Sequence, residues 1–156
     1  MITSDEHNIC RTQGEIFRLA ACQGYDMEVF SRKYLSSDFC RRQFDCRYSR
    51  YQYADAEESW DIFWPELEDA VPRYNDRLCF SPDIAEWIGF TYRQLWYETR
   101  IPSRELVSVI PFTDMRCLYY GYHTLDEDLV AEDLIRIYHL DKRGKNGDRK
   151  IVLGNT

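Results

Sequence analysis

Helix start and stop signals recur along the chain, and they constrain its fold more than any other feature. Thr3 with Glu6 has the spacing of a capping box, and Asp26 precedes a segment whose apolar residues recur with helical spacing. Ser81 followed by Pro82 opens the clearest helical pattern, because proline is favoured at the first helical position. The 7 glycines and 5 prolines separate runs with helical rather than two-residue periodicity. The sequence therefore predicts an all-α fold, a compact bundle of several helices.

Other breaks in the pattern predict where individual helices begin and end. Pro65 is expected to close an acidic helix that starts near Ala54. Thr124 with Glu127 again has capping-box spacing, which predicts the start of a last helix. Residues 66–80 are the least periodic stretch and contain turn-forming residues, so we expect a long loop there.

The 156 residues suit one domain, which we place at residues 1–140. The loop would divide it into two candidate sub-units, 1–65 and 81–140. Their capping signals align at an offset of 76 residues, which indicates an internal duplication into two similar four-helix units. A shared helical rhythm without common ancestry explains this alignment equally well. Residues 141–156 hold a run of basic and glycine residues, which is typical of a flexible basic tail.

The N-terminal residues lack the basic start and the apolar run of a signal peptide, and no window approaches the roughly 18 apolar residues of a transmembrane helix. We therefore expect a cytoplasmic protein without a membrane partner. Its 6 cysteines have irregular spacing and no CxxC motif, which favours reduced and mostly buried thiols. We predict no cofactor and no metal, and a metal site formed by Cys40, Cys46 and His123 stands as the alternative.

One segment carries a resemblance to known proteins. Residues 81–138, about a third of the chain, resemble an uncharacterised family of small helical bacterial proteins common in gut Firmicutes. The sequence is also similar to a short helical domain found in toxin–antitoxin-like loci beside an ADP-ribosyltransferase-like toxin. The resemblance implies a non-catalytic regulatory or neutralising partner protein, and it assigns no functional residue. The matching positions are Trp87-Ile88-Gly89, Tyr92-Arg93, Ser103, the run from Tyr120 to Asp126, and the helix through Leu134.

A cluster of tyrosines surrounds His123 at a predicted helix end. A histidine in this position can act as a general base near neutral pH. No nucleophile or acid lies at a paired spacing, and tyrosines three residues apart are typical of core and cap packing. We therefore assign no catalytic residue and predict that the chain is not an enzyme.

Residues 41–53 interleave arginines with aromatic residues, and residues 32–50 carry a net charge of +4. Arginine neutralises phosphates and aromatic rings stack on bases, so this segment is the candidate nucleic-acid patch. Arginine and tyrosine also dominate the energetics of protein interfaces, and an exposed structural face is the third interpretation. The candidate binding residues of this segment are Arg41, Arg42, Arg47, Tyr48, Arg50 and Tyr51.

Acidic residues dominate the rest of the chain. The formal net charge of −7 disfavours a general nucleic-acid coat protein, and residues 54–90 alone carry −8. A second acidic cluster spans residues 126–133. Such faces can bind a basic partner, although acids are also favourable in the first turn of any helix. The candidate acidic binding residues are Glu57, Glu58, Asp61, Asp126, Glu127 and Asp128.

These features together predict a non-enzymatic protein-binding regulator, antitoxin-like or otherwise inhibitory, that occludes its partner. The partner would be a toxin-like protein or a defence nuclease. Two alternatives stand beside this prediction. One is an anti-defence inhibitor of the anti-CRISPR type, which blocks a protein that processes nucleic acid. The other is a nucleic-acid-binding regulator that uses residues 41–53.

Overall fold

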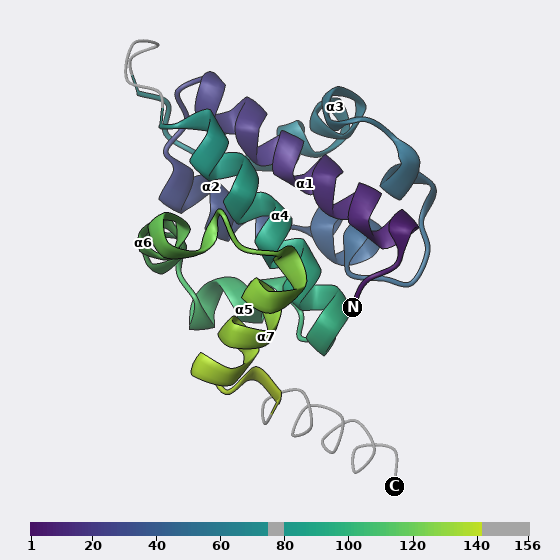
Figure 1. The fold of residues 1–156 in the computed structure, drawn as a ribbon. Helices are drawn as coiled ribbons and strands as arrows, with labels where there is room; N and C mark the ends of the chain where they lie inside the picture. Colours follow the sequence, from purple (N-terminus) through teal and green to yellow (C-terminus); the bar gives the residue numbers. More distant parts are fainter. Residues whose placement is uncertain (75–79, 142–156) are drawn as a thin grey trace, which may run out of the picture.

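The computed structural model describes residues 1–74 and 80–141, and within them it confirms the all-α fold (Figure 1). In these ranges the β contacts are confined to a single bridge between Tyr25 and Arg73. The predicted basic tail lies outside the described residues except for its first residue, and so does Cys79. The helices are α1 (Ser4–Cys22), α2 (Met27–Leu35), α3 (Ala56–Leu67), α4 (Pro82–Thr99), α5 (Ser103–Val109), α6 (Phe112–Tyr122) and α7 (Glu127–Ile137), with a π-helical turn η1 (Cys40–Phe44) and a 3₁₀ turn η2 (Arg50–Tyr53).

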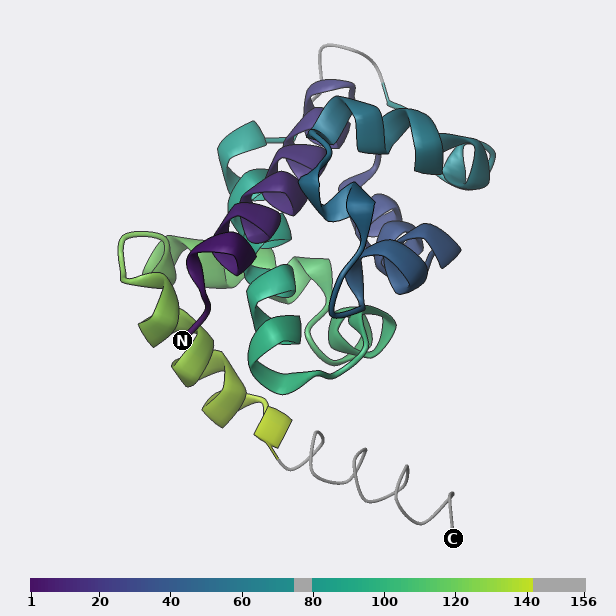
Figure 2. The same ribbon diagram turned by 90° about the vertical axis from the view of Figure 1, so that its right-hand side faces the viewer.

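Helices α1 and α4 pack on each other more extensively than any other pair and form the centre of the fold (Figures 1 and 2). Two glycines permit this close approach. A Cβ at Gly14 would lie 2.8 Å from the carbonyl oxygen of Glu86, and a Cβ at Gly89 would lie 2.7 Å from the Phe17 ring. The Gln13 side chain donates a hydrogen bond to the Gly89 carbonyl at 2.8 Å. Larger residues at either glycine would push the two helices apart.

The first half of the chain packs around an aromatic cluster. Phe17 of α1 contacts Phe30 of α2 edge to face, with ring centroids 5.4 Å apart. Phe30 in turn stacks on Trp60 of α3 at 5.7 Å, and Phe63 meets Trp60 at 5.1 Å. In the second half, α5, α6 and α7 each pack on α4. The aromatic core therefore holds α2 and α3 on α1, and α4 carries the remaining helices.

Local capping signals predict most helix starts correctly. Thr3 and Glu6 form the predicted capping box, and Asp26 accepts a hydrogen bond from the backbone N–H of Val29 at 3.1 Å. Ser81 caps α4, with Pro82 as its first residue. These caps depend only on residues three positions apart, which explains why the sequence reveals them.

Two predicted helix boundaries are wrong. Pro65 does not close α3 but lies inside it, and the helix continues to Leu67. The proline is tolerated because it lies near the last turn with its ring exposed, where the helix loses only one N–H donor. Thr124 does not cap the last helix. Asp126 takes that role, and its side chain accepts from the N–H of Asp128 at 2.9 Å. A carboxylate directly before the helix is the better acceptor for these amides.

The predicted duplication is not confirmed. The first half consists of α1, α2, η1, η2 and α3, and the second half of α4, α5, α6 and α7, so the elements differ in number and in kind. The first half places the turns η1 and η2 between α2 and α3, whereas the second half has the 11-residue helix α6 at that point. Of the predicted loop, residues 66 and 67 belong to α3, and residues 75–79 lie outside the described part of the chain.

A buried polar network joins the two halves. The guanidinium of Arg93 on α4 is fully buried and donates to Gln13 Oε1 at 2.9 Å and to Asp45 Oδ1 at 2.7 Å. Its Nη2 contacts Cys40 Sγ at 3.2 Å and Ser103 Oγ at 3.1 Å. Burial lowers the pKa of Arg93, but Cys40 and Asp45 outweigh this effect and hold the pKa above its ordinary value. The network therefore keeps a full charge inside the fold and fixes η1 to α1, α4 and α5.

Candidate functional site

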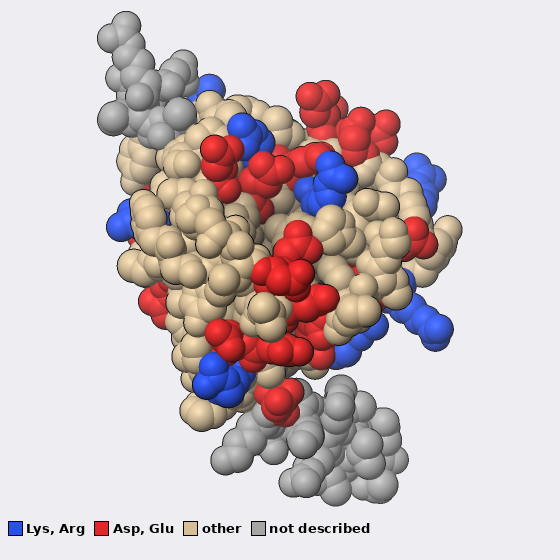
Figure 3. Space-filling view, viewed as in Figure 1, with Lys and Arg blue, Asp and Glu red and all other residues tan. Residues whose placement is uncertain are grey.

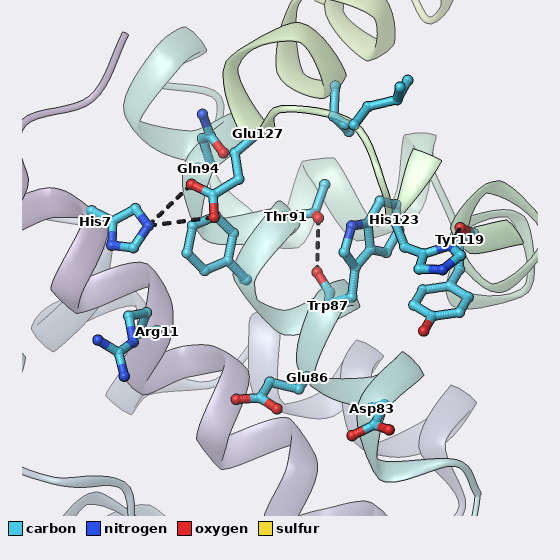
Figure 4. Close-up of a pocket in the computed structure, with 13 residues that line it drawn as sticks. His7, Arg11, Asp83, Glu86, Trp87, Thr91, Gln94, Tyr119, His123 and Glu127 are labelled. Atoms are coloured by element: carbon cyan, nitrogen blue, oxygen red, sulfur yellow. Dashed lines mark hydrogen bonds and ion pairs between the residues drawn. The ribbon is translucent and has the colours of Figure 1, made fainter. Parts of the chain in front are cut away.

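A cavity of about 470 Å³ opens between α1, α4 and the connection from α6 to α7 (Figure 4). Aromatic side chains from two helices line it: Trp87 and Phe90 come from α4, and Tyr119 comes from α6. Trp87 meets Tyr119 edge to face, with centroids 5.7 Å apart. The volume lies in the range of small-ligand and anchor-residue pockets, roughly 300–1,000 Å³.

His7 joins α1 to α7 on one side of this cavity (Figure 4). Its Nε2 lies 3.0 Å from Glu127 Oε2, and both side chains are partly exposed. The His7 ring also packs edge-on against Phe90, with centroids 5.2 Å apart. This contact fixes the start of α7 against α1 and turns the predicted acidic residue Glu127 toward the cavity.

His123 lies on the opposite side of the cavity and is held by Tyr119 (Figure 4). Its Nδ1 donates to the Tyr119 carbonyl at 2.8 Å, and the two rings stack 4.3 Å apart. The hydroxyl of Thr91, which also lines the cavity, donates to the Trp87 carbonyl at 2.7 Å and is therefore engaged within its own helix. These contacts orient His123 by packing and do not pair it with a nucleophile.

Basic side chains offset part of the acidic charge around the cavity. Arg18 Nη1 binds Asp83 Oδ1 at 2.7 Å and Glu86 Oε2 at 3.0 Å. The hydrogen bond to Asp83, aided by Glu86, raises the pKa of Arg18 above its ordinary value. Arg11 lines the cavity as well, and no carboxylate pairs with it among the described residues.

The predicted acidic residues at the start of α7 lie at the rim of this cavity. Asp126 caps α7, and Asp128 accepts a hydrogen bond from the amide of Gln94 at 3.0 Å. Both carboxylates thus bind neutral amide groups, and neither forms an ion pair within the described residues. Figure 3 shows acidic side chains gathered in the middle of this face, in front of α4 and α7.

The predicted arginine and tyrosine residues form a second exposed surface, on and around η1 and η2. Tyr48 and Tyr53 are 72% and 62% exposed, and their rings lie 6.0 Å apart. Gln52 supports this segment from beneath, because its Nε2 donates to the Cys46 carbonyl at 3.1 Å. Of the six predicted residues, Tyr51 is half-buried against the core with Arg50 over its ring, and the exposed ones are Arg41, Arg42, Arg47, Tyr48 and Arg50.

The remaining predicted acidic residues do not join the cavity. Glu57, Glu58 and Asp61 are exposed on α3, next along the chain from η2. Figures 1 and 2 place α3 and α7 at opposite ends of the molecule. The twelve predicted residues therefore divide into an arginine–tyrosine segment with an acidic helix beside it, and a separate acidic rim.

The sequence singled out Glu127 and the tyrosines around His123, Tyr119 among them, but it did not predict that they meet the other residues that shape the cavity. His7 and Arg11 lie on α1, whereas Trp87 and Tyr119 lie on α4 and α6, and only tertiary packing brings them together. The apolar spacing of α1 and α4 predicts their buried stripes and contains no signal that these partly exposed residues converge.

The alternative metal site does not form. Within residues 1–74 and 80–141, no three cysteine, histidine or acidic side chains lie close enough to hold a metal ion, so Cys40, Cys46 and His123 are not brought together. No helix in the same ranges is long and apolar enough to cross a membrane.

Comparisons with family models, curated proteins and solved structures give no match to this chain, and its resemblance to the small helical bacterial family stays a prediction.

Proposed function

We propose that this protein is a non-enzymatic regulator that binds a protein partner and occludes a basic surface on it, as an antitoxin or another inhibitor does. One observation carries the proposal: an acidic rim surrounds a cavity with aromatic walls. Asp126 and Asp128, which form no ion pair within the described residues, supply negative charge at the rim, and Trp87 and Tyr119 supply the walls. Charge at a rim accelerates association, whereas buried anchors slow dissociation.

The cavity suits a lysine or arginine side chain of the partner. The faces of tryptophan and tyrosine attract a cation, and the neighbouring carboxylates bind its N–H groups. Exposed apolar residues extend the contact surface: Leu125 lines the cavity and is 46% exposed, and Leu129 on α7 is 55% exposed. Apolar side chains around a charged anchor exclude water from it, which strengthens the interaction.

Co-expression with the products of the genes that flank its own tests the proposal. We expect one of these products to co-purify in a fixed ratio and its toxicity or nuclease activity to be suppressed. Leu125→Ala should weaken the complex about tenfold. Ile137→Ala is the matched control, because Ile137 is also 46% exposed but lies at the far end of α7 from the cavity. Absence of any complex, or equal weakening by both substitutions, would contradict the proposal.

A second candidate function, nucleic-acid binding by the arginine–tyrosine segment, is supported by the exposed rings of Tyr48 and Tyr53 with Arg47 and Arg50 beside them. Such rings can stack on unpaired bases while the arginines contact phosphates. Gel-shift titrations with short single-stranded RNA and DNA at increasing salt test it. We expect Tyr48→Ala to weaken binding, with Tyr120→Ala as the control, since Tyr120 is 70% exposed on α6. Absence of a shift at low salt excludes this function.

A further inference from the structure

A second cavity, of about 330 Å³, lies on another part of the molecule, between the end of α2, η1 and the link from α4 to α5. Three arginines from separate segments line it: Arg41 from η1, Arg100 from the end of α4, and Arg104 from α5. Neither the acidic rim nor the aromatic cavity described above includes any of them. Three guanidinium groups around one cavity make it positively charged unless carboxylates pair with them.

Arg100 adopts a backbone conformation that is unusual for its residue type. Its φ of 60° lies in the left-handed region, where glycine is favoured. The backbone N–H of Arg100 still closes α4 by donating to the Trp96 carbonyl at 2.7 Å. Its guanidinium lies over the Trp96 ring, 4.4 Å from the ring centroid, and Trp96 also lines the cavity. The left-handed backbone would favour glycine at this position, so the contact of the side chain with Trp96 explains the arginine better than the backbone does.

The carboxylates around this cavity do not neutralise the arginines. Asp38 pairs with Arg41 at 3.2 Å in an exposed contact. Asp45 lines the cavity too, but its oxygens are already engaged by Arg93 and by the backbone N–H of Ser103 at 2.7 Å. Within the described residues, no carboxylate pairs with Arg100 or Arg104. After Asp38 offsets one of the three arginines, about two positive charges remain unpaired at the cavity.

We infer that this cavity binds the phosphate group of a small phosphorylated ligand. Guanidinium forks match the oxygens of phosphate in bidentate contacts, and a phosphate offers enough acceptors for several arginines at once. The cavity is larger than a phosphate group alone, and apolar residues such as Leu35 and Pro102 form part of its wall. The organic part of the ligand lies against that wall while the phosphate faces the arginines.

Isothermal titration calorimetry of the full chain tests the inference, with inorganic phosphate and ribose 5-phosphate as probes and sodium acetate at equal ionic strength as the reference anion. We expect saturable binding of the phosphate probes and none of acetate. Arg104→Gln should weaken binding about tenfold, because it removes one charge-assisted contact. Arg116→Gln is the matched control, since Arg116 is exposed on α6 and does not line this cavity.

Arg100→Gly provides an independent variant, because glycine keeps the left-handed backbone while the guanidinium is lost. We expect the same tenfold loss of phosphate affinity, with thermal unfolding showing that the variant stays folded. The inference is overturned if the phosphate probes bind no better than acetate, or if both variants bind phosphate as tightly as the wild type does. Leu125→Ala should bind phosphate normally, so failure of the protein-binding proposal leaves this result unaffected.

Discussion

Arg93 and Asp45 form an ion pair in the interior of the fold, with 2.7 Å between Nη1 and Oδ1 and side-chain exposures of 0% and 10%. Removing two charges from water is costly unless each donor and acceptor finds a partner. Here Gln13, Cys40 and Ser103 supply the remaining contacts of the guanidinium. The pair lies beneath η1, so it positions the segment that presents the exposed arginines.

Asp45→Asn should therefore destabilise the protein strongly. The substitution leaves the Arg93 guanidinium buried without its counter-charge, and breaking one partner of a buried pair costs about 3–5 kcal/mol. Urea denaturation followed by circular dichroism measures the change in the free energy of unfolding. The control is Asp38→Asn in the exposed pair with Arg41, where a loss below about 1 kcal/mol is expected. Equal losses at the two positions would show that the buried pair contributes no more to the free energy of unfolding than the exposed pair does.

The buried network of Arg93 is a part of the fold that the sequence does not predict. Local signals identify the caps at Thr3, Asp26 and Ser81 because each cap joins residues close in sequence. The helical pattern also predicts that α4 has a buried face. It does not predict that the Arg93 side chain is fully buried, because its partners come from α1, η1 and α5. Such contacts form only in the packed fold, and no spacing of residue types along the sequence indicates them.

The same limit applies to the candidate binding residues. The exposed arginine–tyrosine segment is continuous in sequence, so its composition reveals it. The aromatic cavity combines His7, Trp87 and Tyr119 from three helices, and composition gives no sign that they meet. Charge patterning did identify the acidic start of α7, but it could not separate this rim from the acids of α3 at the other end of the molecule.

The corrected cap of α7 leads to a second prediction. Asp126→Ala should destabilise the protein by about 1 kcal/mol, because its side chain accepts the hydrogen bond of the Asp128 N–H and lies at the positive end of the helix dipole. Thr124→Ala should change stability by less than about 0.5 kcal/mol, since Thr124 is exposed. Thermal unfolding of both variants decides between the two caps. A larger effect at Thr124 would restore the capping box expected from the sequence.

The cysteines should differ sharply in reactivity. Burial raises the pKa of the Cys40 thiol to about 12, although Arg93 beside it acts in the opposite direction. At pH 8 the Cys40 thiol is therefore almost entirely protonated. Cys22 and Cys117 are exposed. Alkylation with iodoacetamide, followed by mass spectrometry, should label Cys22 and Cys117 first and Cys40 only in denaturant. Labelling of Cys40 in the native protein at the same rate would contradict its buried position.

The crossing of α1 and α4 gives the most direct test of the packing. A Cβ at Gly89 would lie within 3 Å of the Phe17 side chain and the Gln13 carbonyl, and the backbone cannot yield without separating the two helices. Gly89→Ala should therefore destabilise the protein by about 2 kcal/mol, even though alanine has the higher helix propensity. Urea denaturation provides the measurement.

Gly121→Ala is the matched control for this test. Gly121 also lies inside a helix, α6, but a Cβ there would meet nothing within 4 Å. The substitution should stabilise the protein by about 0.5–1 kcal/mol, because alanine loses less backbone entropy in a helix. Opposite signs at the two glycines would demonstrate the close contact of α1 and α4 in solution. If Gly89→Ala were also stabilising, the two central helices would have to pack farther apart than the structure places them.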